Sequence, residues 1–309
     1  MEKYYPDWSK IYKFTWGESK PIQGLLEDFL GQNLTNDTSL KNFMNKLGFQ
    51  ELSITTGTYT EQGSFGMAYI NATYNRKTVV VKKLLDPTDI HVFFLESVLQ
   101  CILYNYTERN KCEIRVPEIY AFGQWLGAPV IVMRQVNGEN WSSKNSTKRI
   151  MTIVRGLKQL QKDFNFVHRD FHAGNVLFDG DTPYMIDFGR TCIKDFNANT
   201  PLYVKSPTFY KTVCTNKSHD ICTLVVSLAP YIISVKGMAK NICNAYRNLV
   251  KKSRNPDYDL DSGFSEHHWK DEIFHFHYIM ALEDVELKDF TPEALLKCRT
   301  TQLQFYLKF

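Results

Sequence analysis

Three polar residues at fixed spacing, each beside apolar ones, constrain this chain more than any other feature of its sequence. Asp170 is followed five positions later by Asn175, and Asp187 comes twelve positions after Asn175. A carboxylate in a loop can accept a proton from a hydroxyl group, and an amide with a second carboxylate can hold magnesium ions. Residues that only capped turns would not need to form two linked motifs at this spacing. We therefore interpret residues 167–189 as a candidate catalytic segment.

The two motifs resemble those of the protein kinase family. Residues 168–175 are similar to the H-R-D-x-x-x-x-N catalytic loop, and residues 187–189 are similar to the D-F-G motif. The resemblance implies that Asp170 is the catalytic base and that Asn175 and Asp187 bind Mg²⁺. It also implies transfer of a phosphoryl group from ATP, a reaction in which the protein contributes mainly positioning and charge.

Upstream, residues 60–68 are similar to the glycine-rich loop that covers the ATP phosphates in that family. Glycine lets backbone N–H groups approach phosphate oxygens, because no Cβ intervenes. Glu61 stands where the family's first glycine belongs, so two of three glycines remain. A glycine turn between strands would by itself indicate only a hairpin. The loop residues that the resemblance assigns to ATP are Gly63, Ser64, Phe65, Gly66 and Ala68.

Lys82 follows Gly66 by sixteen residues, in a run similar to the V-A-I-K strand of the family. The lysine of that strand contacts the α- and β-phosphates. Because neighbouring residues of a strand point to opposite faces, only one of Lys82 and Lys83 can face the nucleotide. We choose Lys82 by its motif position and expect Lys83 to be solvated. Glu96, on the helix that follows, is expected to pair with Lys82 and hold it in place.

Residues 130–138 resemble the strand and hinge that join the two lobes of the family. Adenine would then hydrogen-bond the backbone near residues 135–136, and either Glu139 or Asn140 would reach the ribose. Met133 would flank the back of the pocket, although ordinary core packing explains it equally well. The pocket residues that the resemblance assigns are Val80, Met133, Gln135, Val136, Glu139 and Leu177.

Strand and helix signals divide the chain into two main parts. Strand-like runs separated by turn residues fill residues 51–135, and amphipathic helical spacing prevails in residues 136–309. Residues 1–50 show helical spacing of their own. We predict a bilobal, protein-kinase-like α+β fold, with a helical N-terminal extension (1–50), a β-rich N-lobe (51–135) and an α-helical C-lobe (136–309).

Some departures from the protein kinase pattern concern the substrate. No A-P-E follows residues 187–189 at the usual place, and His172 stands where Ser/Thr kinases usually carry lysine. The D-x-H-x-G-N pattern of residues 170–175 is also similar to aminoglycoside and choline kinases, which phosphorylate small molecules. Those kinases usually have glycine before the aspartate, whereas this chain has Arg169. An arginine there commonly anchors an activation segment, which favours a protein kinase and leaves the substrate class open.

Two residues near the catalytic loop are expected to support it. Asp220 is similar to the aspartate that braces this loop in protein kinases, although a helix N-cap role would also explain it. Arg169 could bind a phosphate carried by residues 190–217, with Ser206 and Thr208 as the preferred sites. The missing A-P-E favours the alternative, in which Arg169 only braces the loop through backbone carbonyls.

Neither the cysteines nor the histidines show the spacing of a metal site. The seven cysteines are scattered without any C-x-x-C, so we expect no disulfide framework and no cysteine-based zinc site, as in the reducing interior of a cell. Four histidines near the C-terminus lie close in sequence, but no carboxylate or cysteine spacing of a known site accompanies them. A polar loop entering a helix is the preferred account of His267, His268, His275 and His277.

Composition argues against several other classes of protein. The formal net charge is +4 without a block of like charges, which argues against a nucleic-acid or membrane partner. No apolar run reaches the roughly eighteen residues of a membrane helix, and the N-terminus lacks the apolar stretch of a signal peptide. We therefore expect an intracellular protein, in a host cell if the source is a virus or an intracellular bacterium, whose kinases diverge in a similar way. The sequence leaves the oligomeric state open.

The resemblance predicts an enzyme that uses ATP and Mg²⁺ to phosphorylate a protein hydroxyl, on serine or threonine rather than tyrosine. One alternative is a small-molecule kinase of the same fold. Another is a pseudokinase that binds nucleotide without turnover. The last is the least favoured, because the chain retains the full set of catalytic residues, namely Lys82, Glu96, Asp170, Asn175 and Asp187.

Overall fold

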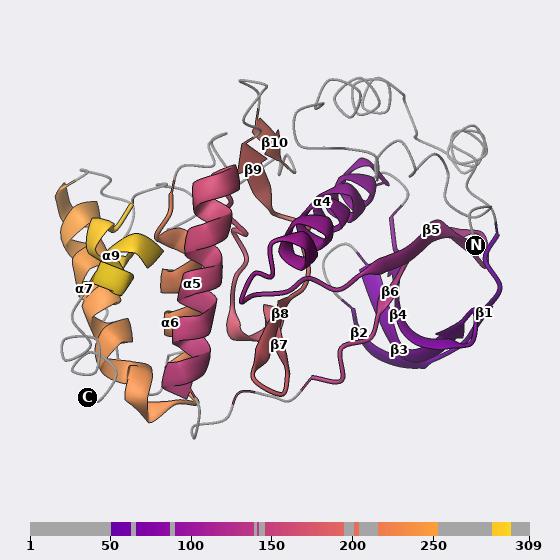
Figure 1. The fold of residues 1–309 in the computed structure, drawn as a ribbon, viewed down its shortest axis with the longest axis horizontal. Helices are drawn as coiled ribbons and strands as arrows, with labels where there is room; N and C mark the ends of the chain where they lie inside the picture. The colour runs from indigo at the N-terminus through magenta and orange to yellow at the C-terminus, as the bar shows by residue number, and fades with distance from the viewer. Residues whose placement is uncertain are drawn as a thin grey trace.

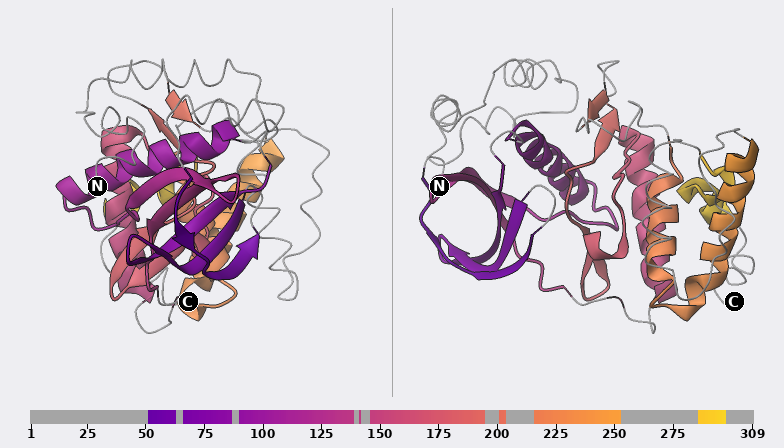
Figure 2. Two further views of the ribbon diagram at one scale, coloured as in Figure 1. Left: turned by 90° about the vertical axis from the view of Figure 1, so that its right-hand side faces the viewer. Right: turned by 180° about the vertical axis from the view of Figure 1, so that it is seen from behind.

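The computed structural model describes residues 51–62, 66–86, 90–138, 141, 146–194, 201–203, 216–252 and 286–297, and every structural statement below concerns these residues. They form two lobes, one a curled antiparallel sheet with a helix beside it and the other mainly helical (Figure 1). The view from behind shows the same division (Figure 2). The predicted bilobal α+β fold is confirmed. Residues 1–50 lie outside the described part, so the predicted extension and domain boundaries stay predictions.

The sheet of the N-lobe has six strands in the order β1-β3-β4-β6-β5, with β2 also paired to β3. All of these pairs are antiparallel. Its elements are β1 (Ile54–Thr55), β2 (Thr58–Gln62), β3 (Gly66–Tyr74), β4 (Lys77–Leu84), α4 (Ile90–Arg109), β5 (Ile119–Trp125) and β6 (Ala128–Arg134).

Tight turns connect the strands where the sequence supplies residues that tolerate positive φ. Asn75 and Arg76, the predicted turn between β3 and β4, have φ values of 48° and 63°. Leu126 and Gly127 join β5 to β6 with φ values of 52° and 72°. Two consecutive residues at positive φ match the right-handed twist of the strands that they connect.

Side chains on the two faces of the sheet enter two different hydrophobic clusters. On β4, Val79 and Val81 belong to a cluster within the sheet, whereas Val80 packs against the larger core that includes α4. The alternation follows from the two-residue period of a strand. Lys82 therefore shares the α4 side of the sheet with Val80, and Lys83 shares the opposite side with Val81.

The C-lobe is built on helices with small two-stranded sheets beside them (Figure 1). Its elements are α5 (Ser146–Phe164), η4 (Ala173–Asn175), β7 (Val176–Asp179), β8 (Thr182–Met185), β9 (Cys192–Lys194), β10 (Pro201–Tyr203), α6 (His219–Leu228), η5 (Ile233–Val235), α7 (Lys236–Lys252), η6 (Lys288–Phe290) and α9 (Pro292–Lys297).

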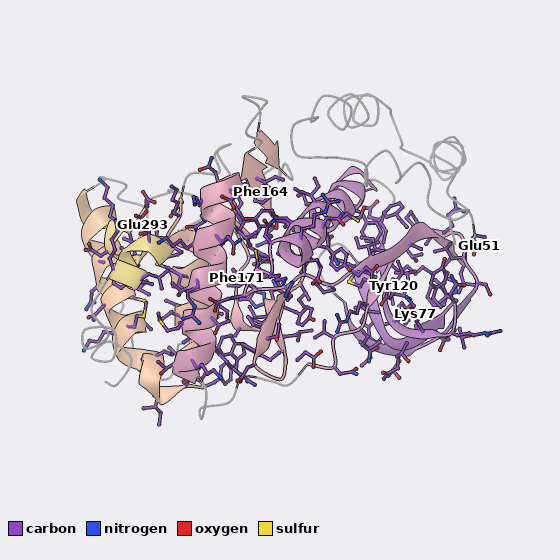
Figure 3. All side chains as sticks on the ribbon, viewed as in Figure 1. Glu51, Lys77, Tyr120, Phe164, Phe171 and Glu293 are labelled. Carbon is purple, nitrogen blue, oxygen red and sulfur yellow. The ribbon has the colours of Figure 1, made fainter. Side chains whose placement is uncertain are left out.

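Helix α6 lies at the centre of this lobe, and all of its residues are buried. Helix α5 is amphipathic and turns one apolar stripe toward the core, as its sequence predicts. Phe164 at the end of α5 and Phe171 before η4 are both buried in that core (Figure 3). At the start of α9, the hydroxyl of Thr291 accepts a hydrogen bond from the Ala294 N–H (3.2 Å).

The cysteine prediction holds only in part. Cys101, Cys112, Cys222 and Cys243 are free and buried, as expected for reduced thiols. Cys192 is disulfide-bonded, a single bond that the sequence analysis did not predict. Among the described helices, none has the length and apolar character needed to cross a membrane.

Candidate functional site

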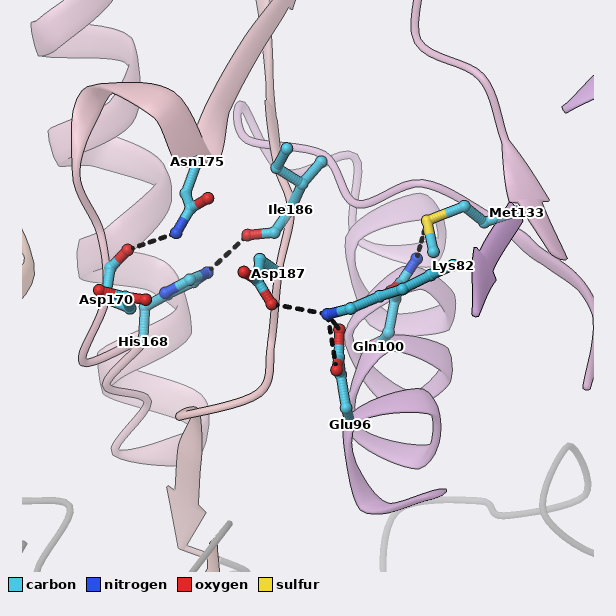
Figure 4. Close-up of polar contacts among 9 residues, drawn as sticks. All are labelled: Lys82, Glu96, Gln100, Met133, His168, Asp170, Asn175, Ile186 and Asp187. Carbon is cyan, nitrogen blue, oxygen red and sulfur yellow. Dashed lines mark hydrogen bonds and ion pairs between the residues drawn. The ribbon is translucent and has the colours of Figure 1, made fainter. Parts of the chain in front are cut away.

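Lys82 on β4 lies between two carboxylates that come from distant parts of the chain (Figure 4). Its Nζ lies 2.7 Å from Oε1 and 2.9 Å from Oε2 of Glu96 on α4. The same Nζ lies 2.9 Å from Oδ1 of Asp187, which follows β8. The predicted pairing of Lys82 with Glu96 is therefore present, and it extends to Asp187 across the two lobes.

The charges of this cluster support one another. Burial would lower the pKa of Lys82, but the carboxylates of Glu96 and Asp187 outweigh it and raise that pKa, so the ammonium stays charged. The Lys82 ammonium lowers the pKa of Asp187 to about 2. Glu96 is buried, and it also receives a hydrogen bond from the Phe188 backbone N–H, which ties α4 to the D-F-G segment.

Lys83 lies on the opposite face of the sheet, as strand alternation predicts. Its Nζ lies 5.7 Å from the centre of the Trp125 ring, at a distance typical of a cation–π contact. The side chain is half-buried rather than fully solvated, which differs from the sequence-based expectation. The difference arises because the curl of the sheet brings Trp125 of β5 over the face on which Lys83 lies.

The catalytic-loop backbone is held by Asp220 at the start of α6. Its Oδ2 accepts the His168 N–H (2.8 Å) and its Oδ1 accepts the Arg169 N–H (3.0 Å). Asp220 is fully buried, so these two charge-assisted hydrogen bonds are not exposed to water. The predicted brace is confirmed. Arg169 itself has φ of 67°, a strained conformation for a residue with a side chain.

Asp170 and Asn175 are locked together by hydrogen bonds within the loop. The Asn175 Nδ2 donates to the Asp170 carbonyl (2.8 Å), which leaves the amide oxygen of Asn175 turned away from that bond. The Ile186 N–H donates to the Asn175 carbonyl (3.1 Å), so the residue before Asp187 is bound directly to the loop. The Asp170 side chain is 22% exposed.

His168 connects the catalytic loop to the D-F-G segment from within the core. Its Nε2 lies 3.0 Å from the Ile186 carbonyl and therefore donates to it. The ring packs against Phe171 and Phe188, each with its ring centre 5.3 Å away. Burial lowers the pKa of His168, so the ring stays neutral and serves as a structural link.

The predicted nucleotide pocket is placed by close backbone packing. A Cβ at Gly66 would lie 2.8 Å from the Lys83 carbonyl oxygen, so glycine permits β3 to approach β4 closely there. A Cβ at Gly138 would lie 2.9 Å from the Cβ of Leu177, which brings the hinge against β7. Ala68 pairs with Lys82. The first contact brings β3 close to β4, which carries Lys82, and the second brings the segment at Gly138 close to β7 of the C-lobe.

Met133 and Gln135 are held by partners at the lobe junction. Met133 on β6 pairs with Val80 and is buried, and its Sδ lies 3.7 Å from Nε2 of Gln100. The Gln135 side chain exchanges two hydrogen bonds with Asn71 of β3, at 2.7 and 2.8 Å. Val136 is buried next to it, so its side chain belongs to the core, while the hinge backbone continues between the lobes.

Several predicted residues lie outside the described part of the chain. The nucleotide-loop residues in this group are Gly63, Ser64 and Phe65. The ribose candidates are Glu139 and Asn140, the phosphorylation candidates are Ser206 and Thr208, and the histidine group is His267, His268, His275 and His277.

The donor set of the cleft fits a magnesium ion bound together with phosphates. Asn175 and Asp187 offer oxygen atoms, which Mg²⁺ prefers, and Mg²⁺ is commonly held by one or two protein groups plus substrate phosphates. The carboxylate of Asp187 has a second oxygen beyond the one that binds Lys82. Within the described residues, no group of three His, Cys, Asp or Glu side chains could hold a metal without such phosphates.

The sequence analysis did not single out three residues that contact this site. Arg190 places Nη1 3.5 Å from Oδ1 of Asp170. Trp141 donates from Nε1 to the Ala173 carbonyl (3.1 Å), and Gln100 donates from Nε2 to the Pro117 carbonyl (2.9 Å). Only Arg190 carried a usable signal, because it directly follows the D-F-G motif; the other two depend on distant pairing.

Comparison with known families supports the catalytic segment. Residues 148–197 match the model of the phosphotransferase enzyme family. This stretch contains the loop residues Asp170 and Asn175 as well as Asp187. No curated protein matches the chain. The family match agrees with the resemblance to the protein kinase superfamily and to its aminoglycoside- and choline-kinase-like members.

Proposed function

We propose that this chain, a phosphotransferase with a protein-kinase-like fold, transfers the γ-phosphoryl group of ATP to a serine or threonine hydroxyl of a protein. The observation that carries the proposal is the Lys82 Nζ held at once by Glu96 and by Asp187. A lysine that joins the two lobes suits a reaction that depends on placing phosphates and an acceptor together. In this proposal Asp170 would lie next to the hydroxyl group of the acceptor.

Each residue of the N-lobe half has a role in holding the nucleotide. Lys82 would hold the α- and β-phosphates with its ammonium, and Glu96 would fix the lysine in that position. Asp187 and Asn175 would hold Mg²⁺, which supplies charge neutralisation on the phosphates when Mg·ATP is bound. Because Asp187 is ionised well below neutral pH, its carboxylate is ready for a cation under all physiological conditions.

Asp170 would act on the acceptor. Its side chain is 22% exposed and its backbone carbonyl is bonded by Asn175, so it would be able to accept the proton of an incoming hydroxyl group. The acceptor oxygen forms the new bond to the γ-phosphorus, and the bond from that phosphorus to the bridging oxygen of ADP breaks. The retained set of catalytic residues makes a pseudokinase role the least favoured alternative.

A protein acceptor is supported by Arg169. Its φ of 67° is a conformation that glycine adopts without strain, and small-molecule kinases usually have glycine at this place. An arginine kept there at a conformational cost suggests that its side chain has a function of its own. A second candidate, a small-molecule kinase, is favoured by the phosphotransferase family match over residues 148–197. We propose neither a nucleic-acid nor a membrane partner.

Labelled ATP distinguishes these candidates. The protein is incubated with γ-labelled ATP and Mg²⁺, alone, with generic protein substrates and with a metabolite extract. Label on serine or threonine of the protein substrates supports the proposal, and label confined to small molecules supports the second candidate. Nucleotide binding without any transfer, in wild type and under all three conditions, would contradict both.

A further inference from the structure

Arg190 places a cation beside the catalytic carboxylate, and none of the roles proposed above uses it. The residue directly follows Gly189, in a turn closed by the hydrogen bond from the Thr191 N–H to the Phe188 carbonyl (3.0 Å). Its Nη1 lies 3.5 Å from Oδ1 of Asp170. The backbone of Arg190 therefore belongs to the D-F-G segment, while its guanidinium contacts the carboxylate of Asp170.

The contact with Asp170 is too weak to explain Arg190 as a structural ion pair. The side chains of Arg190 and Asp170 are 38% and 22% exposed and meet at one distance of 3.5 Å. Such a partly exposed pair contributes little to stability. By contrast, Arg155 on α5 holds both carboxylate oxygens of Glu113 at 2.6 and 2.7 Å. Arg190 is thus loosely held and available to a ligand in the cleft.

Arg190 is paired with the carboxylate that the proposed function assigns to the acceptor. Lys82 is paired with Asp187, which the same proposal assigns to the nucleotide, and Arg190 is paired with Asp170. In the proposed reaction the phosphoryl group would approach Asp170 as it bonds to the acceptor. Without a cation there, the negative oxygens of the group would approach the carboxylate of Asp170 unshielded.

We propose that Arg190 donates hydrogen bonds to the oxygens of the phosphoryl group during transfer, an inference that rests on the proposed phosphotransfer function. In this step the acceptor oxygen bonds to the γ-phosphorus, and the bond from γ-phosphorus to the bridging oxygen breaks with its electron pair left on ADP. The hydroxyl proton passes to Asp170. The planar N–H donors of the Arg190 guanidinium match phosphoryl oxygens. A fixed cation aimed at developing charge lowers the barrier.

Binding of a phosphoryl mimic tests this role without turnover. ADP, Mg²⁺ and fluoroaluminate together imitate the group in transfer, and calorimetry measures how much fluoroaluminate tightens Mg·ADP binding. We expect fluoroaluminate to increase the affinity of wild type for Mg·ADP about 100-fold or more, the lower end of the range for transition-state mimics. Arg190→Ala should bind Mg·ADP within about twofold of wild type and lose most of that gain, because one charged donor to the mimic is gone. Arg155→Ala, an arginine on the outer face of α5, is the matched control and should keep the gain.

The outcomes separate this inference from the function on which it rests. A full gain in Arg190→Ala overturns the role of Arg190 and leaves phosphotransfer standing. Wild type that binds Mg·ADP but gains nothing from fluoroaluminate also contradicts the inference. Wild type that does not bind Mg·ADP overturns the proposed function and the inference together. If thermal unfolding shows that Arg190→Ala does not fold, Arg190→Gln, which keeps the bulk without the charge, replaces it and must show the same loss.

Discussion

The two halves of the site are held in place by different forces. In the N-lobe half, the Lys82 ammonium is held by side-chain contacts to Glu96 and Asp187, which come from separate elements. In the C-lobe half, Asp220 binds two consecutive backbone N–H groups of the catalytic loop from within the core. The first arrangement joins elements that can move apart, and the second is part of the packed lobe.

This difference separates the part of the site that can be regulated from the part that cannot. A small shift of α4 would break the contact between Lys82 and Glu96, because side chains alone join these two residues. The loop bound by Asp220 can change shape only with local unfolding around α6, whose residues are all buried. We expect the catalytic loop to be the constant half and the lysine cluster to be the adjustable half.

The largest effect is expected at Asp187, the residue that both halves share. Asp187→Ala should reduce Mg²⁺-dependent phosphoryl transfer to background and weaken Mg·ATP far more than metal-free nucleotide, because the carboxylate serves the cation. Transfer assays and nucleotide titrations with and without Mg²⁺ measure both. Asp179→Ala, at an exposed aspartate that ends β7, is the control and should behave as wild type. Unchanged magnesium dependence in Asp187→Ala would contradict the assignment.

Asp170→Asn tests the constant half alone. The variant should lose about 10²- to 10⁴-fold in turnover, the usual contribution of a positioned base, and should bind ATP nearly as wild type does. The backbone contacts of the loop remain, since the Asp170 carbonyl rather than its carboxylate accepts the hydrogen bond from Asn175. Steady-state kinetics with an ATP-binding measurement checks this. Turnover within a few-fold of wild type would remove Asp170 from the role.

Glu96→Gln tests the adjustable half alone. Loss of one charge-assisted hydrogen bond costs about 1.5–3 kcal/mol, which corresponds to roughly a 10- to 100-fold decrease in turnover through a misplaced Lys82. Lys82 keeps its contact with Asp187, so the loss should be smaller than in the two variants above. Lys83→Gln is the matched control, because Lys83 lies on the other face, over Trp125. Equal losses in both variants would show that the choice of Lys82 is wrong.

Asp220→Asn is expected to act on stability rather than on one chemical step. An amide can accept one of the two backbone N–H groups but presents its own NH₂ to the other, which costs about 1–3 kcal/mol. Denaturant unfolding measures this loss, and turnover per folded molecule should stay within a few-fold of wild type. An Asp220→Asn variant as stable as wild type would contradict the role of Asp220 as a brace.

The smallest effect concerns pH. Lys82 lowers the pKa of Asp187 to about 2, so ionised Asp187 stabilises the folded state above the ordinary pKa of an aspartate, about 3.9. That contribution is lost as the pH falls from about 4 through 2. Asp187→Asn should therefore unfold at a lower temperature than wild type at pH 7, and the difference should shrink toward pH 2. A difference that stays constant down to pH 2 would contradict the ion pair.

The sequence alone led to much of the site because its motifs are local. Asp170 and Asn175 are five positions apart, and Asp187 comes twelve positions after Asn175. Residues this close in sequence can be assigned to one site from their spacing. Lys82 could be preferred over Lys83 by its motif position, because the two-residue period of a strand lets only one of them face the nucleotide. Glu96 was reachable by its place on the next helix.

Other features required the tertiary structure, because they depend on residues far apart in sequence. The reach of Lys82 to Asp187 spans 105 positions, and no pattern along the chain reports it. The disulfide of Cys192 and the position of Lys83 over Trp125 are likewise products of the packed fold. The contact of Arg190 with Asp170 arises from the turn after the D-F-G motif. Local periodicity and motif spacing therefore determined the elements and the candidate residues, whereas the packing of the lobes decided which charges meet.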